Sequence, residues 1–114
     1  MNVIASKDML EKIVCELSIF EQDILTALDE NLLIRKEFVK SKLKELQPNI
    51  QTALNEKNLF TPEEFSKIWI SFRNMRSVSS ENNEKEINAS ILLSNINDIL
   101  SCLRQAICRI SVSG

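Results

Sequence analysis

The sequence contains no histidine and no tyrosine, and its only glycine is the last residue, Gly114. Without histidine there is no Ser-His or Cys-His nucleophile pair, no histidine-ligated metal site and no phosphorelay histidine. Without an internal glycine there is no phosphate-binding loop of the GxGxxG or GxxxxGK type, because both need glycine for close approach of the backbone. We therefore expect neither an enzyme nor a bound cofactor or metal.

The scarcity of glycine also bears on the fold. Type I′ and II′ hairpin turns need residues at positive φ and are disfavoured, whereas helix ends can use asparagine in place of glycine. Of the 114 residues, 44% are hydrophobic and 26% are charged, which is typical of a single globular domain. We expect one all-α domain spanning residues 1–114.

Further absences concern location. No segment approaches the roughly 18 apolar residues of a transmembrane helix, and residues 1–8 lack the features of a secretory signal. The net charge of −2 provides no general attraction for nucleic acid or for an anionic membrane. Cys15, Cys102 and Cys108 form no CxxC pair, which favours reduced thiols. We expect a cytoplasmic protein that does not insert into membranes.

Apolar residues recur at helical spacing in four segments, about 3–28, 32–57, 61–77 and 83–110. The third begins with Thr61-Pro62-Glu63-Glu64, a capping box in which the Thr61 and Glu64 side chains bond each other's backbone amides. Residues 77–83 are polar and predict a loop. Pro48 interrupts the second segment without a phase slip, so we expect a kinked helix, with two helices split at Gln47 as the alternative.

Short connections between these segments predict an antiparallel up-down four-helix bundle with a short third helix and a Pro-kinked second helix. A third helix of about 15 residues would stop midway along neighbours of about 26–29, at 1.5 Å per residue. The hairpin between the first two helices would then retain an open apolar groove for a partner helix. The residues expected to line this groove are Phe20, Ile24, Leu28, Leu32 and Phe38.

The segment 35–45 carries five positive and two negative charges. One interpretation is a phosphate-contacting helix, and the other is a solvated face beside an acidic first helix. We favour the solvated face, because the charges scatter around the helix and no exposed aromatic residues interleave with them. The candidate phosphate contacts are Arg35, Lys36, Lys40, Lys42 and Lys44.

The segment 68–76 mixes aromatic residues with arginines. The favoured interpretation places Trp69 and Phe72 in the core and Arg73 and Arg76 on the last helical turn. An interface hot spot and a base-stacking surface are the alternatives. Self-association is a further option, through apolar residues off the main stripes at Cys15, Ile19, Leu25 and Ile70.

These patterns favour a non-enzymatic protein–protein interaction module: an adaptor, a chaperone-like binder or an assembly subunit. Its partner would be another protein that docks a helix in the groove, or a second copy in a homodimer. The alternative is a nucleic-acid-associated regulator that contacts phosphates through segment 35–44.

Overall fold

The computed structural model describes residues 3–30, 33–56, 58–80 and 87–113. This described part of the chain forms four helices and no β-strand: α1 (Val3–Asp29), α2 (Lys36–Asn55), α3 (Pro62–Ser80) and α4 (Ala89–Ser113). The all-α prediction is therefore confirmed. No helix in these ranges combines the length and apolar character that crossing a membrane requires.

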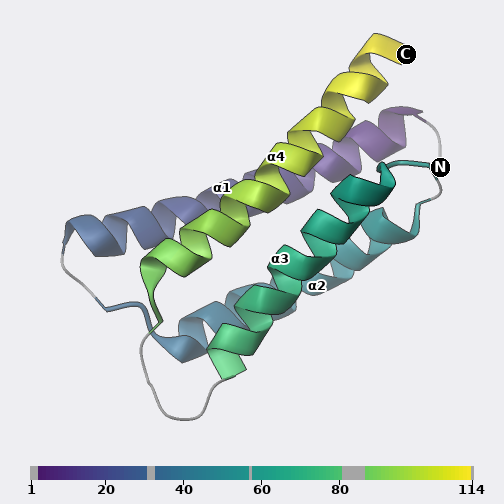
Figure 1. The fold of residues 1–114 in the computed structure, drawn as a ribbon. Helices are drawn as coiled ribbons and strands as arrows, with labels where there is room; N and C mark the ends of the chain where they lie inside the picture. Colours follow the sequence, from purple (N-terminus) through teal and green to yellow (C-terminus); the bar gives the residue numbers. More distant parts are fainter. Residues whose placement is uncertain (1–2, 31–32, 57, 81–86, 114) are drawn as a thin grey trace.

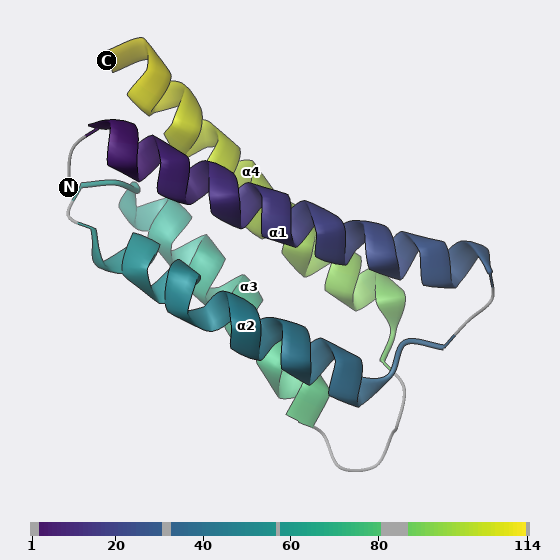
Figure 2. The same cartoon turned by 180° about the vertical axis from the view of Figure 1, so that it is seen from behind.

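Each helix packs against the next one in the chain, and α1 also packs against α4 (Figures 1 and 2). In the described part of the chain, the backbones of the diagonal pairs α1/α3 and α2/α4 stay farther apart, with no two Cα atoms within 8 Å. The four helices thus surround one core in an elongated body of 45 × 25 × 21 Å. The start of α1 and the end of α4 lie at the same end of this body.

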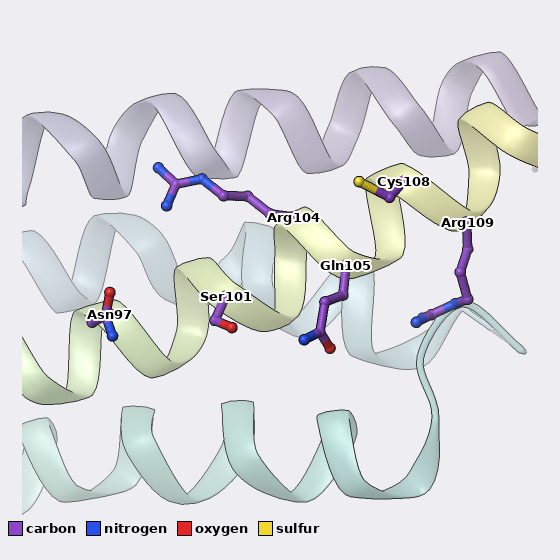
Figure 3. A pocket seen from close by; sticks show the side chains of 6 residues that line it. All are labelled: Asn97, Ser101, Arg104, Gln105, Cys108 and Arg109. Carbon is purple, nitrogen blue, oxygen red and sulfur yellow. The ribbon is translucent and has the colours of Figure 1, made fainter.

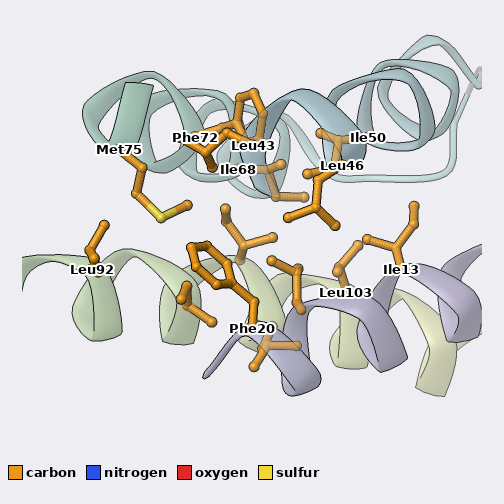
Figure 4. Packing of buried hydrophobic residues seen from close by; sticks show 14 of the residues in the cluster. Ile13, Phe20, Leu43, Leu46, Ile50, Ile68, Phe72, Met75, Leu92 and Leu103 are labelled. Atoms are coloured by element: carbon orange, nitrogen blue, oxygen red, sulfur yellow. The ribbon is translucent and has the colours of Figure 1, made fainter. Parts of the chain in front are cut away.

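The core follows the apolar stripes that the spacing predicts. On α1 the stripe from Leu10 to Ile24 is at most 1% exposed, and on α4 the stripe from Leu92 to Ala106 is buried as well. Figure 4 shows side chains from all four helices converging on the same interior: Ile13, Phe20, Leu43, Leu46, Ile50, Ile68, Phe72, Met75, Leu92 and Leu103. Burial of these stripes supplies the main driving force for folding.

The predicted helix lengths are wrong for the two middle helices. α2 has 20 residues and α3 has 19, against 27 for α1 and 25 for α4. α2 begins only at Lys36, because the preceding residues pair with the segment before α4: the Ile87 amide donates to the Ile34 carbonyl at 3.0 Å. The Ile34 side chain is also buried, so this connection is held at the end of the bundle.

The third helix continues through residues predicted as a loop and ends at Ser80. The reason is that its buried face continues beyond Met75: Ser79 is 2% exposed, and Val78 packs against the core. The Ser79 hydroxyl donates to the Arg76 carbonyl at 2.9 Å. α3 is therefore only one residue shorter than α2 and does not stop midway along it, although it remains shorter than α1 and α4.

α2 is one helix with Pro48 inside it, so the alternative of two helices split at Gln47 is wrong. Pro48 is solvent-exposed, where its missing amide costs least, and its carbonyl accepts a hydrogen bond from the Thr52 hydroxyl at 2.8 Å. In the connection to α3, Asn58 adopts the left-handed conformation with φ of 65°. Asparagine here takes the position that glycine commonly fills after a helix.

Candidate interaction surface

The first turn of α3 is closed by a polar network. The Thr61 amide donates to Glu64 Oε1, and the Glu64 amide donates to Thr61 Oγ1, both at 3.1 Å, so the predicted capping box is confirmed. Arg109 of α4 adds a fork: its two terminal nitrogens donate to the two Glu64 oxygens at 2.7 and 2.5 Å. One of them also donates to the Leu59 carbonyl at 3.1 Å. We call Thr61, Glu64 and Arg109 the α3–α4 lock.

The charges within the α3–α4 lock stabilise each other. The hydrogen bonds from Arg109 lower the pKa of the Glu64 carboxyl, an effect that outweighs the opposing influence of burial, and the Thr61 amide lowers it further. The same bonds raise the pKa of Arg109. Both groups are therefore charged and paired at neutral pH. The charges of the α3–α4 lock therefore compensate each other within the fold.

The flank of α3 next to its buried stripe carries two exposed aromatic residues. Trp69 is 42% exposed and Phe65 is 45% exposed, so the prediction of a core position is wrong for Trp69, although it is confirmed for Phe72, which is 3% exposed. Ser71 is buried, so the buried face of α3 is turned toward Ser71 and away from Trp69. Phe65 and Trp69 are four residues apart and thus share one side of the helix.

Between α2 and α3 lies a small hollow of about 210 Å³. Lys40 and Lys44 enter it from α2, and Arg76 enters it from α3. None of these three cations lies within 4 Å of a carboxylate in the described part of the chain. We call this feature the basic hollow; its lining residues are Lys40, Leu43, Lys44, Gln47, Arg76, Ser79 and Ser80.

The aromatic pair and the basic hollow lie on the same side of α3. Trp69 and Arg76 are seven residues apart, which is close to two full helical turns, so both face the α2 side. Arg73 is also exposed, one turn beyond Trp69. We call the combination of Phe65, Trp69, Arg73 and the basic hollow the α2–α3 surface. It has an aromatic end and a cationic end, separated by about 10 Å along the helix axis.

The structure separates the five basic residues predicted as phosphate contacts. Lys40 and Lys44 share the basic hollow, but Lys36 is buried with 9% exposed. Lys42 lies 3.9 Å from Glu45, and its ammonium is 5.9 Å from the centroid of the Phe38 ring. Arg35 is exposed at the residue before α2. The sequence could have indicated Arg76 only if the pairing of α2 with α3 had been known.

The residues predicted to line a groove at the first hairpin have different environments. Phe20 and Ile24 are buried in the core at 0% and 1% exposed, so they offer no surface to a partner. Phe38 packs against Phe20 edge to face, with 5.9 Å between ring centroids, and keeps 38% of its surface exposed. Leu28 is 46% exposed, and Leu32 lies outside the described residues.

Two larger hollows lie elsewhere on the described part of the chain. One of about 620 Å³ runs along α4 (Figure 3) and is lined by Asn97, Ser101, Arg104, Gln105, Cys108 and Arg109. The other, of about 580 Å³, lies between α3 and α4, where Lys67 and Asp98 form an ion pair at 3.8 Å. Burial raises the pKa of the Cys102 thiol. Within the described ranges, no three Cys, Asp or Glu side chains gather to hold a metal ion.

Comparison of the chain with protein-family models, with curated proteins and with solved structures finds no match.

Proposed function

We propose that this chain is a cytoplasmic, non-enzymatic protein–protein interaction module that binds its partner through the α2–α3 surface. As part of this proposal, the four helices run antiparallel in up-down order, and α2 bends at Pro48. The observation that supports it best is the exposure of Trp69 beside Phe65 on a helix whose core stripe is already complete. Tryptophan and arginine are the residues most enriched in interface hot spots, and this surface offers both.

The proposed binding site thus moves from the first hairpin to the opposite side of α2. At the hairpin, two of the predicted residues are used by the core, whereas Phe65 and Trp69 remain available. Leu28 and Phe38 are retained as a secondary apolar contact. The partner is another protein, and a second copy of this chain is one version of that proposal.

Nucleic-acid binding is the second candidate, and one observation favours it. Lys40, Lys44 and Arg76 converge on one side of α3 that also carries an exposed tryptophan about 10 Å along the helix axis, and ssDNA- or RNA-binding surfaces combine cations with aromatic stacking. Against it, only three cations gather in the hollow, and the chain as a whole has a net charge of −2.

Photo-crosslinking from defined positions tests the proposed function. A benzoylphenylalanine replaces Trp69 in one variant and the exposed Gln105 of α4 in a matched control, and each variant is irradiated in extract of its source cells. We expect discrete adducts from position 69 only, which are destroyed by protease, resist nuclease and diminish when Phe65→Ala is added. Equal adducts from both positions would contradict the proposed site. Nuclease-sensitive adducts would favour the second candidate.

A further inference from the structure

We propose that the partner segment bound by the α2–α3 surface is acidic and amphipathic, with carboxylates in the basic hollow and bulky apolar side chains on Phe65 and Trp69. This inference rests on the proposed function and specifies the chemistry of the partner. It is argued from the arrangement of charge, from the size of the hollow and from the division of the surface into two unlike ends.

The arrangement of positive charge around the basic hollow favours binding of an anion. Lys40, Lys44 and Arg76 approach one hollow from two helices, and their charges repel one another. Elsewhere, Lys7, Lys42, Lys67 and Arg109 each have a carboxylate within 4 Å, whereas single exposed cations such as Lys12 and Arg104 have none among the described residues. The hollow differs from those single sites because it gathers three cations. The three cations of the hollow have no carboxylate within 4 Å among the described residues, so a bound carboxylate would reduce the repulsion among these three charges.

The hollow is suited to small anionic groups. Its volume of about 210 Å³ equals that of about seven waters, at about 30 Å³ each in the liquid. This leaves room for one or two side-chain carboxylates, with further polar groups from Gln47 and Ser80 on the wall. The Ser79 hydroxyl is already committed to the Arg76 carbonyl and does not contribute.

The division of the surface distinguishes a peptide from a nucleic acid. Phe65 and Trp69 form an apolar end near the start of α3, while Arg73, Arg76 and the lysines of α2 form a cationic end. A nucleic acid strand presents a phosphate beside every base and would be matched by cations along the whole surface. A peptide with acidic residues at one end and apolar residues at the other matches both ends at once.

Fluorescence anisotropy with a labelled peptide tests this inference. From Phe65 to Arg76 the surface spans about 16 Å, so a helical peptide of about 14 residues covers it. The probe carries four glutamates in one half and leucines and phenylalanines in the other. A matched probe has glutamine in place of every glutamate, and a third probe is an oligothymidylate of similar length. We expect the glutamate peptide to bind at least about tenfold more tightly than the glutamine peptide.

Variants of the full chain locate the binding. Lys40→Glu with Lys44→Glu should weaken binding of the glutamate peptide by about tenfold or more, and Phe65→Ala with Trp69→Ala should do the same. Lys12→Glu with Arg104→Glu makes the same charge change on α1 and α4 and should alter the affinity less than about twofold. Circular dichroism confirms that each variant keeps its helical content.

Three results would overturn the inference. They are equal affinity for the glutamate and glutamine peptides, equal loss in the control variant, and tighter binding of oligothymidylate with a steep salt dependence. If position-69 protein adducts persist while the peptides fail in one of these ways, the proposed function stands and only the partner's chemistry is wrong. If those adducts are absent, the proposed function itself fails.

Discussion

The two ends of α3 use charged side chains in opposite ways. At its first turn, Glu64 is buried and receives hydrogen bonds from Thr61 and from both terminal nitrogens of Arg109. Near its last turn, Arg76 meets Lys40 and Lys44 in a hollow that no described carboxylate enters. The charges of Glu64 and Arg109 are matched within the fold, whereas Lys40, Lys44 and Arg76 have no carboxylate within 4 Å among the described residues.

For the same reason, removing a charged side chain should change the free energy of unfolding by different amounts at the two ends of α3. Removing one partner from a buried, hydrogen-bonded ion pair leaves an uncompensated charge, which is costly. Removing one of several like charges at a surface costs little and can even relieve repulsion. Substitutions at the two ends should therefore separate effects on stability from effects on binding.

The largest effect on stability is expected at the α3–α4 lock. Arg109→Ala leaves the buried Glu64 carboxylate with only the Thr61 amide, and the free energy of unfolding should fall by about 2 kcal/mol, a value reduced because Arg109 is itself 43% exposed. Urea denaturation measures this change. Arg104→Ala, an exposed arginine on the same helix, is the control and should change stability by less than about 0.5 kcal/mol. Equal losses in the two variants would show that the fork does not stabilise the fold.

The pH dependence of stability provides a second test of the pairing at the first turn of α3. Because the folded pKa of Glu64 lies below its ordinary value of 4.5, the folded state holds this proton less tightly than the unfolded state does. The stability from Glu64 is thus fully present above about pH 4.5 and is lost as the pH falls through the lowered pKa. The difference in unfolding free energy between the natural chain and Glu64→Gln should shrink over that acidic range. A difference independent of pH would contradict the pairing with Arg109.

A smaller effect of opposite sign is expected at the basic hollow. Arg76→Gln removes one of three neighbouring positive charges, so the free energy of unfolding should stay constant or rise by up to about 0.5 kcal/mol. The gain should fade at high salt, where repulsion between exposed charges is screened. A loss of more than 1 kcal/mol, measured by urea denaturation, would mean that Arg76 has a structural role like that of Arg109.

Local signals predicted much of this fold. The spacing from Leu10 to Ile24 and from Leu92 to Ala106 identified the core faces, and the residues from Thr61 to Glu64 identified the start of α3. Such patterns are decided by neighbours within one or two helical turns. What depends on contacts between helices was not predictable, because spacing along one helix does not show which flank its neighbour covers.

Three residues illustrate this limit. Arg109 is 45 positions from Glu64, and the capping box alone already gave that carboxylate a partner. Trp69 is a large aromatic residue of the kind that usually packs in a core. Only the position of α2 shows that the side of α3 carrying Trp69 stays exposed to solvent. Ser79 resembles a loop residue, but it is buried because α3 continues packing beyond Met75.

The exposure of Trp69 has an optical consequence. The chain has one tryptophan and no tyrosine, so its intrinsic fluorescence on excitation above the phenylalanine band comes from this single indole. Because the indole is partly exposed to solvent on the α2–α3 surface, its emission wavelength reports the solvent exposure of that site alone. A partner that covers the site should shift the emission to the blue, while one that docks beside Leu28 should leave the spectrum unchanged. The protein thus carries its own unlabelled reporter for the surface proposed to bind.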